Sequence, residues 1–184
     1  MKANYFRWPF TLTLLILFEK GNCQYQPCPY DKIDKQHLFN YTCDGDLIIH
    51  GKIDGGSDGS LSSYHGSCII EDKIDGGSSV SIKCAGNLII ADKIDGGSSV
   101  TITAGGYCSI GNKIDNGSTH VVIRCKGDIR VIDKIDGGCH VKLYSETGHV
   151  HIKEIGNSNT EVRYHSPYAI QVDGKTDSAP IRIP

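Results

Sequence analysis

Residues 68–87, CIIEDKIDGGSSVSIKCAGN, are followed directly by LIIADKIDGGSSVTITAGGY at residues 88–107, and the second segment repeats the pattern of the first. The Lys-Ile-Asp motif that they share occurs six times, at residues 32–34, 52–54, 73–75, 93–95, 113–115 and 134–136. A constant period of about 20 residues is typical of a stacked repeat protein, not of an ordinary globular core. The repeat therefore indicates the architecture of the molecule more clearly than its function.

Within each repeat, apolar residues occupy alternate positions over short runs, as at Leu88 and Ile90 and again at Val100 and Ile102. Such runs predict strands, and the Gly-Gly and Ala-Gly-Asn segments between them predict corners. Proline is absent between residues 31 and 166, as expected where interior strands donate every backbone N–H. The sequence thus predicts an all-β fold, a parallel β-helix (β-solenoid) with about 20 residues per turn, about seven turns and a right-handed coil. A β-sandwich of hairpins is the alternative, but it would not need this period.

Equivalent side chains of successive turns should stack in columns about 4.8 Å apart. One inward column is expected to contain Ile33, Ile53, Ile74, Ile94, Ile114, Ile135 and Ile155. The repeat weakens at both ends, which predicts a cap and a first irregular turn at 24–46, solenoid repeats at 47–169 and a C-terminal cap at 170–184.

The first 23 residues lie outside the repeat. Lys2 and Arg7 precede an apolar run at residues 11–18, and a polar segment follows, so residues 1–23 are predicted to be a secretory signal peptide. A membrane anchor or an N-terminal core helix is the alternative. Without this segment the chain has 16 basic and 20 acidic residues, a net charge of −4. That balance gives no nucleic-acid-binding signature. The mature chain is expected to be extracellular, without a membrane span.

The pattern Ile-x-x-x-Lys-Ile-Asp-Gly-Gly, which covers roughly residues 47–155, resembles that of the bactofilins. These are bacterial polymer-forming solenoid proteins built from short Ile/Val strands and glycine corners. The resemblance implies the architecture and raises self-association as a hypothesis. Bactofilins are cytoplasmic, whereas the leader and the cysteines of this chain indicate secretion.

The cysteines recur at set places in the repeat. Cys43, Cys84 and Cys125 each stand four residues before the start of a turn, and Tyr64, Ala104 and Glu146 are expected at the equivalent positions of the intervening turns. Stacked two turns apart, the three cysteines would be about 9.6 Å from one another, too far for disulfides. Each has a nearer candidate, which predicts the pairs Cys28–Cys43, Cys68–Cys84 and Cys108–Cys125. Unpaired cysteines buried in the core are the alternative.

Cys139 is left over, because Cys23 belongs to the expected signal peptide. It replaces the serine expected at the same position in other turns, at Ser57, Ser78, Ser98 and Ser118. An odd cysteine in a secreted protein suggests a free thiol or an intermolecular disulfide. A disulfide-linked dimer through Cys139 is therefore a hypothesis.

Lysine and aspartate flank the inward isoleucine, so both should point outward and form adjacent columns of opposite charge. This candidate ligand face comprises Lys52, Asp54, Lys73, Asp75, Lys93, Asp95, Lys113, Asp115, Lys134 and Asp136. It could bind extracellular polysaccharide, matrix or mineral. The favoured interpretation is a charge-compensated surface, because individual surface ion pairs contribute little.

Other sites have weaker support. The 20-residue period does not match calcium-binding nonapeptide repeats, and a Ser81–Thr101 column suited to ice binding is broken at Val122 or Ile123. His149 and His151 should share a strand face, which suggests at most an adventitious metal site. The sequons at Asn40 and Asn116 permit glycosylation.

We expect no enzymatic activity, no cofactor and no resident metal, because a catalytic site requires one place unlike all the others. The favoured function is a secreted, disulfide-stabilised structural or surface-interaction protein, with self-association as a further hypothesis. A carbohydrate- or mineral-binding module and a glycan-active enzyme are the alternatives.

Overall fold

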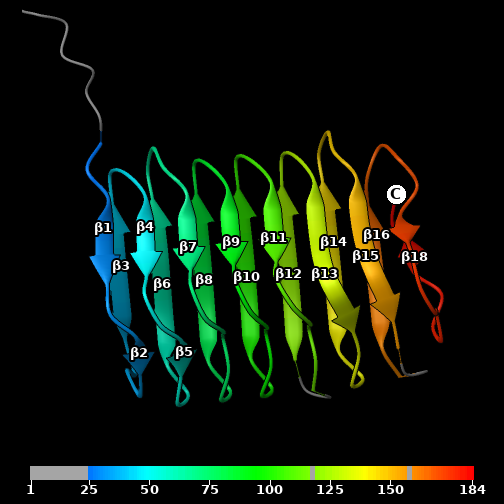
Figure 1. Ribbon diagram of the computed structural model, residues 1–184, viewed down its shortest axis with the longest axis horizontal. Coiled ribbons are helices and arrows are strands. Elements are labelled where there is room, and N and C mark those ends of the chain that lie inside the picture. The colour runs from blue at the N-terminus through cyan, green and yellow to red at the C-terminus, as the bar shows by residue number, and fades with distance from the viewer. Residues whose placement is uncertain (1–24, 117–118, 157–158) are drawn as a thin grey trace, which may run out of the picture.

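The computed structural model describes residues 25–116, 119–156 and 159–184, so the signal peptide expected at residues 1–23 lies outside the described residues. The described chain is an all-β parallel solenoid of about eight turns with about 20 residues per turn, which confirms the predicted fold class (Figure 1). No helix in these ranges is long and apolar enough to cross a membrane.

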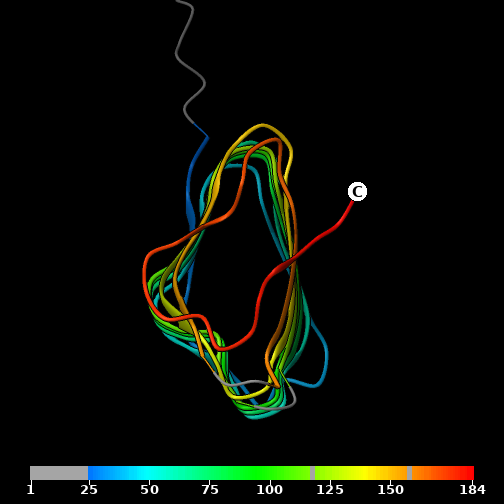
Figure 2. The same cartoon turned by 90° about the vertical axis from the view of Figure 1, so that its right-hand side faces the viewer.

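Two parallel sheets form the long sides of the coil. The short-strand sheet contains, in spatial order, β1 (Cys28–Tyr30), β4 (Leu47–Ile49), β7 (Cys68–Ile70), β9 (Leu88–Ile90), β11 (Cys108–Ile110), β13 (Ile129–Ile135), β15 (Val150–Ile155) and β17 (Gln171–Val172). The long-strand sheet contains β3 (Phe39–Cys43), β6 (Asp58–Ser63), β8 (Ser79–Cys84), β10 (Ser99–Ala104), β12 (His120–Cys125), β14 (His140–Ser145), β16 (Glu161–His165) and β18 (Ile181–Arg182). Viewed along the coil, successive turns superimpose as a flattened closed loop (Figure 2).

The Lys-Ile-Asp motifs lie between the two sheets. β2 (Ile33–Asp34) pairs with β5 (Ile53–Asp54), and single parallel bridges continue this column from Ile53 to Ile135. Ile135 then pairs with Ile155, and Ile155 with Thr176. The inward isoleucine column is thus confirmed in full, and it extends by one further position at Thr176.

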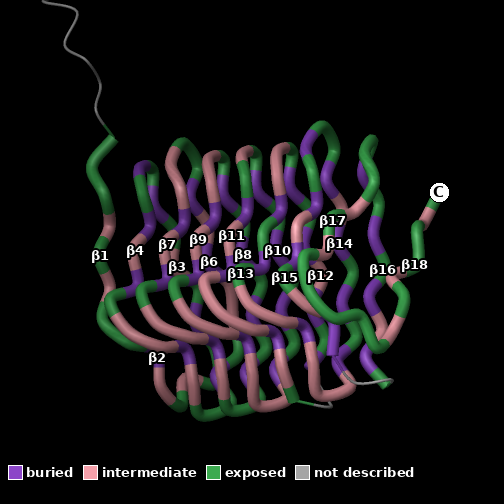
Figure 3. Tube along the Cα trace, turned by 45° about the vertical axis from the view of Figure 1, so that its right-hand side comes forward, coloured by how far each residue is buried: buried purple, intermediate pink, exposed green. Residues whose placement is uncertain are grey.

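Alternation along each strand separates the core from the surface. In β8 the side chains of Val80, Ile82 and Cys84 are buried, whereas those of the intervening residues are exposed. The same burial pattern recurs in β10. Buried residues therefore stack along the whole inside of the coil (Figure 3). Full burial of one isoleucine side chain contributes about 1.5–3 kcal/mol. Because a single turn cannot bury these side chains without its neighbours, the stack of turns is the folding unit.

Strand pairing reaches further toward both ends than the sequence pattern indicated. β1 and β3 pair in register with β4 and β6, although the repeat is weak there. In this first turn Lys35 takes the left-handed backbone conformation (φ 53°) that a glycine takes in other turns. At the other end, β17 and β18 extend the two sheets by one strand each.

Candidate functional site

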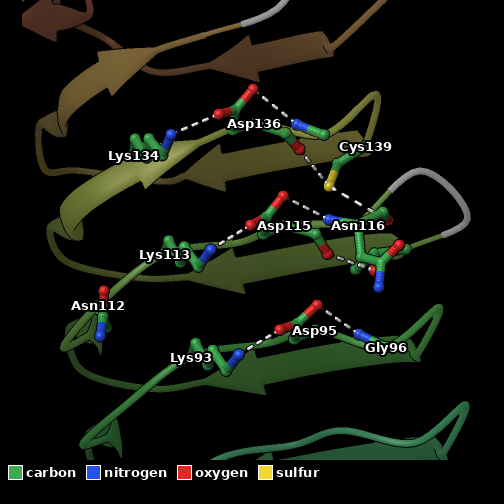
Figure 4. A network of polar contacts seen from close by, with 12 residues as sticks. Lys93, Asp95, Gly96, Asn112, Lys113, Asp115, Asn116, Lys134, Asp136 and Cys139 are labelled. Atoms are coloured by element: carbon green, nitrogen blue, oxygen red, sulfur yellow. Dashed lines mark hydrogen bonds and ion pairs between the residues drawn. The ribbon is translucent and has the colours of Figure 1, made fainter.

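The candidate ligand face consists of ion pairs that close within each turn. Lys73 Nζ lies 2.5 Å from Asp75 Oδ2, and Lys134 Nζ lies 2.5 Å from Asp136 Oδ2. Lys93 and Lys113 pair in the same way with the aspartate two residues later (Figure 4). This arrangement follows from the strand, because residues on either side of an inward isoleucine project from the same outer face.

The other carboxylate oxygen of each aspartate binds the corner that follows. Oδ1 of Asp75 and of Asp95 accepts a hydrogen bond of 2.6 Å from the backbone N–H of the next residue, a glycine in both turns. Asn116 replaces that glycine after Asp115 and makes the same contact at 2.7 Å with φ 79°. The Asp-Gly-Gly sequence therefore specifies a corner, as the sequence predicted.

A buried column of hydroxyl groups also binds these aspartates, through their backbone carbonyls. Ser78 Oγ donates to the Asp75 carbonyl and Ser98 Oγ to the Asp95 carbonyl, both at 2.7 Å. Thr119 continues the column with a bond of 2.7 Å to the Asp115 carbonyl. The assignment of Ser118 to this column is wrong, because strand register pairs Ser99 with His120 and so places Thr119 beside Ser98. Ser118 itself lies outside the described residues.

Pairing shifts the ionisation of both partners. The hydrogen bond from Lys52 holds the pKa of the Asp54 carboxyl below its ordinary value, and the N–H of Gly55 acts in the same direction. Lys134 has the same effect on the pKa of Asp136. In turn, the hydrogen bond to the aspartate raises the pKa of Lys52 and of Lys134. Both charges persist over a wide pH range, and each is neutralised by its neighbour.

These contacts leave little of the motif for an external ligand. The side chains of Lys93 and Asp95 are 24% and 14% exposed, and both are engaged within their own turn. The geometry favours the charge-compensated interpretation of the columns. Their aspartates organise the corners, and their lysines hold the aspartates.

Cys139 occupies the hydroxyl column as a buried free thiol. It is 0% exposed, and its Sγ lies 2.8 Å from the Asp136 carbonyl oxygen (Figure 4). Burial, aided by the carboxylates of Asp115 and Asp136, raises the pKa of the thiol to about 12. A disulfide-linked dimer through Cys139 would require this buried sulfur to become accessible, so the structure gives the hypothesis no support.

The three predicted disulfides are confirmed, with Cα–Cα distances of 5.8, 5.8 and 6.2 Å for Cys28–Cys43, Cys68–Cys84 and Cys108–Cys125. Each joins the short-strand sheet to the long-strand sheet within one turn. A closed loop of this length contributes about 3 kcal/mol by restricting the unfolded chain.

The residues between these disulfides differ in part from the sequence-based expectation. Strand register places Ser63, Ala104 and Ser145 next to the cysteines of this column. The prediction of Ala104 is confirmed, whereas Tyr64 and Glu146 are each wrong by one residue. The reason is a corner one residue longer in those two turns. Ser63 Oγ donates to the Gly45 carbonyl and Ser145 Oγ to the Gly127 carbonyl, at 2.7 and 2.8 Å. Hydroxyl groups thus close these two turns where disulfides close others.

The histidines of the last turns, His140, His149, His151 and His165, do not form one cluster, and they contact different partners. His149 stacks on Tyr168 at a centroid distance of 4.0 Å, whereas His151 Nε2 lies 2.6 Å from Asp173 Oδ2. His140 and His165 belong to the long-strand sheet, on the other side of the coil. No group of three or more metal-binding side chains occurs within the described ranges.

Both sequon asparagines are exposed. Asn40 lies on β3, where its Oδ1 accepts a hydrogen bond of 2.9 Å from Ser60 Oγ. Asn116 lies at a corner whose next two residues are outside the described ranges.

Strand register also settles the column considered for ice binding and reveals a change along it. The column runs Ser60, Ser81, Thr101, Val122, Lys142 and Arg163. It is broken at Val122, as expected, and then becomes basic. The repeat pattern of the sequence does not reveal this change, because Lys142 and Arg163 lie outside the Lys-Ile-Asp motif. Comparison of the chain with protein-family models, with curated proteins and with solved structures finds no match. The resemblance to the bactofilins therefore rests on the repeat pattern and the coil alone.

Proposed function

We propose that the protein is a secreted, non-catalytic structural or surface-interaction rod. The observation that carries this proposal is the closure of alternate turns by three disulfides within an uninterrupted parallel stack. Disulfides persist in oxidising compartments. Regular turns give a rigid body with extended outer faces, and such faces are the surfaces that solenoid proteins use for binding.

Two further features of the chain support an extracellular location. Residues 1–23 have the composition of a signal peptide, and two exposed asparagines are glycosylation acceptors in sequence context. Self-association of rods is part of the proposal, through contacts other than Cys139.

Expression of the full chain with a C-terminal tag in a secretory cell line tests this proposal. We expect the protein in the medium or matrix fraction, with its N-terminus after residue 23 and three disulfides by mass spectrometry. Cytosolic retention with reduced cysteines would contradict it. Sedimentation of the purified protein over a concentration series tests the structural class, which predicts oligomers in the absence of any ligand.

A binding module is the second candidate function. It is favoured by the basic residues that gather on the outer face of the long-strand sheet, at positions that strand pairing does not require to be charged. A glycan-active enzyme is a weaker alternative, and it predicts a product released from glycan by the purified protein.

A further inference from the structure

Most basic side chains have a carboxylate partner within 4.0 Å, and the exceptions are concentrated on one face. Among the described residues, the lysines and arginines without an ion pair are Lys35, Lys83, Arg124, Lys126, Lys142 and Arg182. Four of these six project from the outer side of the long-strand sheet or from the corner that follows it. We define the basic face as Lys83, Arg124, Lys126, Lys142 and Arg163, together with Tyr144.

Strand register stacks these side chains, except that of Lys126 in the corner after β12, in two neighbouring columns. Lys142 and Arg163 are adjacent in one column, on β14 and β16. Arg124 and Tyr144 are adjacent in the other, and the guanidinium carbon of Arg124 lies 4.7 Å from the Tyr144 ring centroid. Like charges on adjacent strands are destabilising. Earlier turns carry Ser81 and other small hydroxyl residues at such positions, so the fold itself does not need the cations.

The surface beside each of these columns is hollowed. A recess of about 270 Å³ is lined by His120, His140, Lys142, Glu161 and Arg163 among others. A second recess, of about 550 Å³, is lined by Arg124, Lys126, Tyr144 and Glu146 among others. Both are open to solvent along the sheet, which suits an elongated ligand better than a compact one.

The charge of this face differs in sign from that of the rest of the molecule. Its five basic residues are accompanied by two acidic ones, Glu146 and Glu161, which gives a net charge of +3 with histidines neutral. The remaining 11 basic and 18 acidic residues after residue 24 sum to −7. Glu161 is already bound by Arg163 and by His140. An anion is therefore attracted to this face and repelled elsewhere.

We propose that the basic face binds a linear anionic polysaccharide whose sugars carry carboxylate or sulfate groups. The planar guanidinium groups of Arg124 and Arg163 match the geometry of such oxyanions. The Tyr144 ring, over which the Arg124 guanidinium lies, adds a hydroxyl group that can hydrogen-bond to the polymer. Repeated charges on the polymer engage several cations at once, which multiplies weak contacts.

Other polyanions fit the observations less well. A membrane surface requires apolar side chains that insert, and the outer strand positions of this face between β8 and β16 present only the half-buried Val122 as an aliphatic side chain. Nucleic acid is disfavoured by the net charge of −4 for the chain after the leader. The proposal deepens the extracellular role and rests on it for the source of the polymer, but its test uses purified protein.

Binding of the purified, oxidised protein to heparin, a sulfated uronate polysaccharide, tests the proposal. The variant Arg124→Gln/Lys142→Gln removes two cations from the basic face. The control Arg130→Gln/Lys153→Gln changes the net charge equally, but on the opposite sheet, where Asp128 and Asp133 pair with these residues. Urea-unfolding midpoints of both variants confirm that the coil is intact.

We expect the dissociation constant for heparin to rise about tenfold or more in the face variant and to change less than about twofold in the control. Added salt should weaken wild-type binding. An equal loss in both variants, or no binding by the wild type, would overturn the proposal. Equal or tighter binding to phosphatidylserine vesicles or duplex DNA would also overturn it. Failure of secretion in cells would instead contradict the extracellular role without altering these binding results.

Discussion

Gly76 and Gly77 form one Asp-Gly-Gly corner, yet we expect alanine to affect them very differently. Both have a left-handed backbone, with φ of +66° and +74°. For alanine this conformation costs about 1–2 kcal/mol. A Cβ at Gly77 would have its nearest neighbour at 3.8 Å, the carbonyl oxygen of Gly96, so backbone strain is the whole cost there.

At Gly76 the added Cβ would overlap Asp54 Oδ1 of the preceding turn and lie 2.8 Å from the backbone nitrogen of Gly55. Asp54 would have to rotate away and give up its hydrogen bond of 2.6 Å from Gly55 N–H. A hydrogen bond to a charged group contributes about 1.5–3 kcal/mol. We therefore expect Gly76→Ala to lower the free energy of unfolding by about 3–5 kcal/mol, and Gly77→Ala by about 1–2 kcal/mol.

Equilibrium urea unfolding of the oxidised protein, followed by circular dichroism, measures both changes. The double variant Asp54→Ala/Gly76→Ala completes a mutant cycle. Because Asp54→Ala removes the obstructing carboxylate, Gly76→Ala should cost less in that background than in the wild type. Equal destabilisation by the two glycine variants, or an additive cycle, would refute the role assigned to Asp54.

Four further outcomes are expected. Ile94→Ala should lower the free energy of unfolding by about 2–5 kcal/mol through a cavity in the central column, whereas Ile132→Ala, at an exposed position, should change it by less than about 0.5 kcal/mol in the same urea titration. Cys139→Ser should leave stability within about 1 kcal/mol of the wild type and leave migration on non-reducing gels unchanged, because a hydroxyl is native to that column. Reduction of the disulfides should lower the free energy of unfolding by about 3 kcal/mol per bridge and so lower the thermal unfolding midpoint. An unchanged midpoint would contradict that estimate. The pKa of Asp136 is lowered in the folded state. Its ionised carboxylate therefore stabilises the fold above the unfolded pKa of about 3.9, and this stabilisation is lost as the pH falls through the folded pKa. The urea midpoint should fall at acid pH, and less steeply in Asp136→Asn.

Much of the fold could be predicted because the repeat encodes it redundantly. The isoleucine column follows from one motif that recurs at a nearly constant period, and each copy confirms the others. The disulfide pairs followed from the same period, since stacking excludes cysteines two turns apart. The errors at Tyr64, Glu146 and Ser118 share one cause, which is a corner longer by a single residue. Spacing along the chain cannot locate such an insertion, whereas hydrogen-bonded register can.

The candidate site was harder to predict because its properties depend on contacts between turns. The sequence presented Cys139 as an odd cysteine available for pairing, but strand register places its thiol inside the hydroxyl column. The sequence also presented the Lys-Ile-Asp charges as a candidate ligand face, whereas the lysine and aspartate of each motif pair with each other. The cations of the basic face are scattered singly through the sequence at Lys83, Arg124 and Lys142. They form a surface only after the four turns from β8 to β14 are stacked.

The period, the strand-and-corner alternation, the inward isoleucines and the closure of alternate turns by disulfides all follow from the sequence. These are local or periodic properties, set by side-chain alternation and by the short reach of a disulfide. Tertiary structure alone decided which residues stand side by side in successive turns. That register buried Cys139 and gathered the unpaired cations on one face, because burial and net charge at a surface depend on neighbours about 20 residues away in the chain.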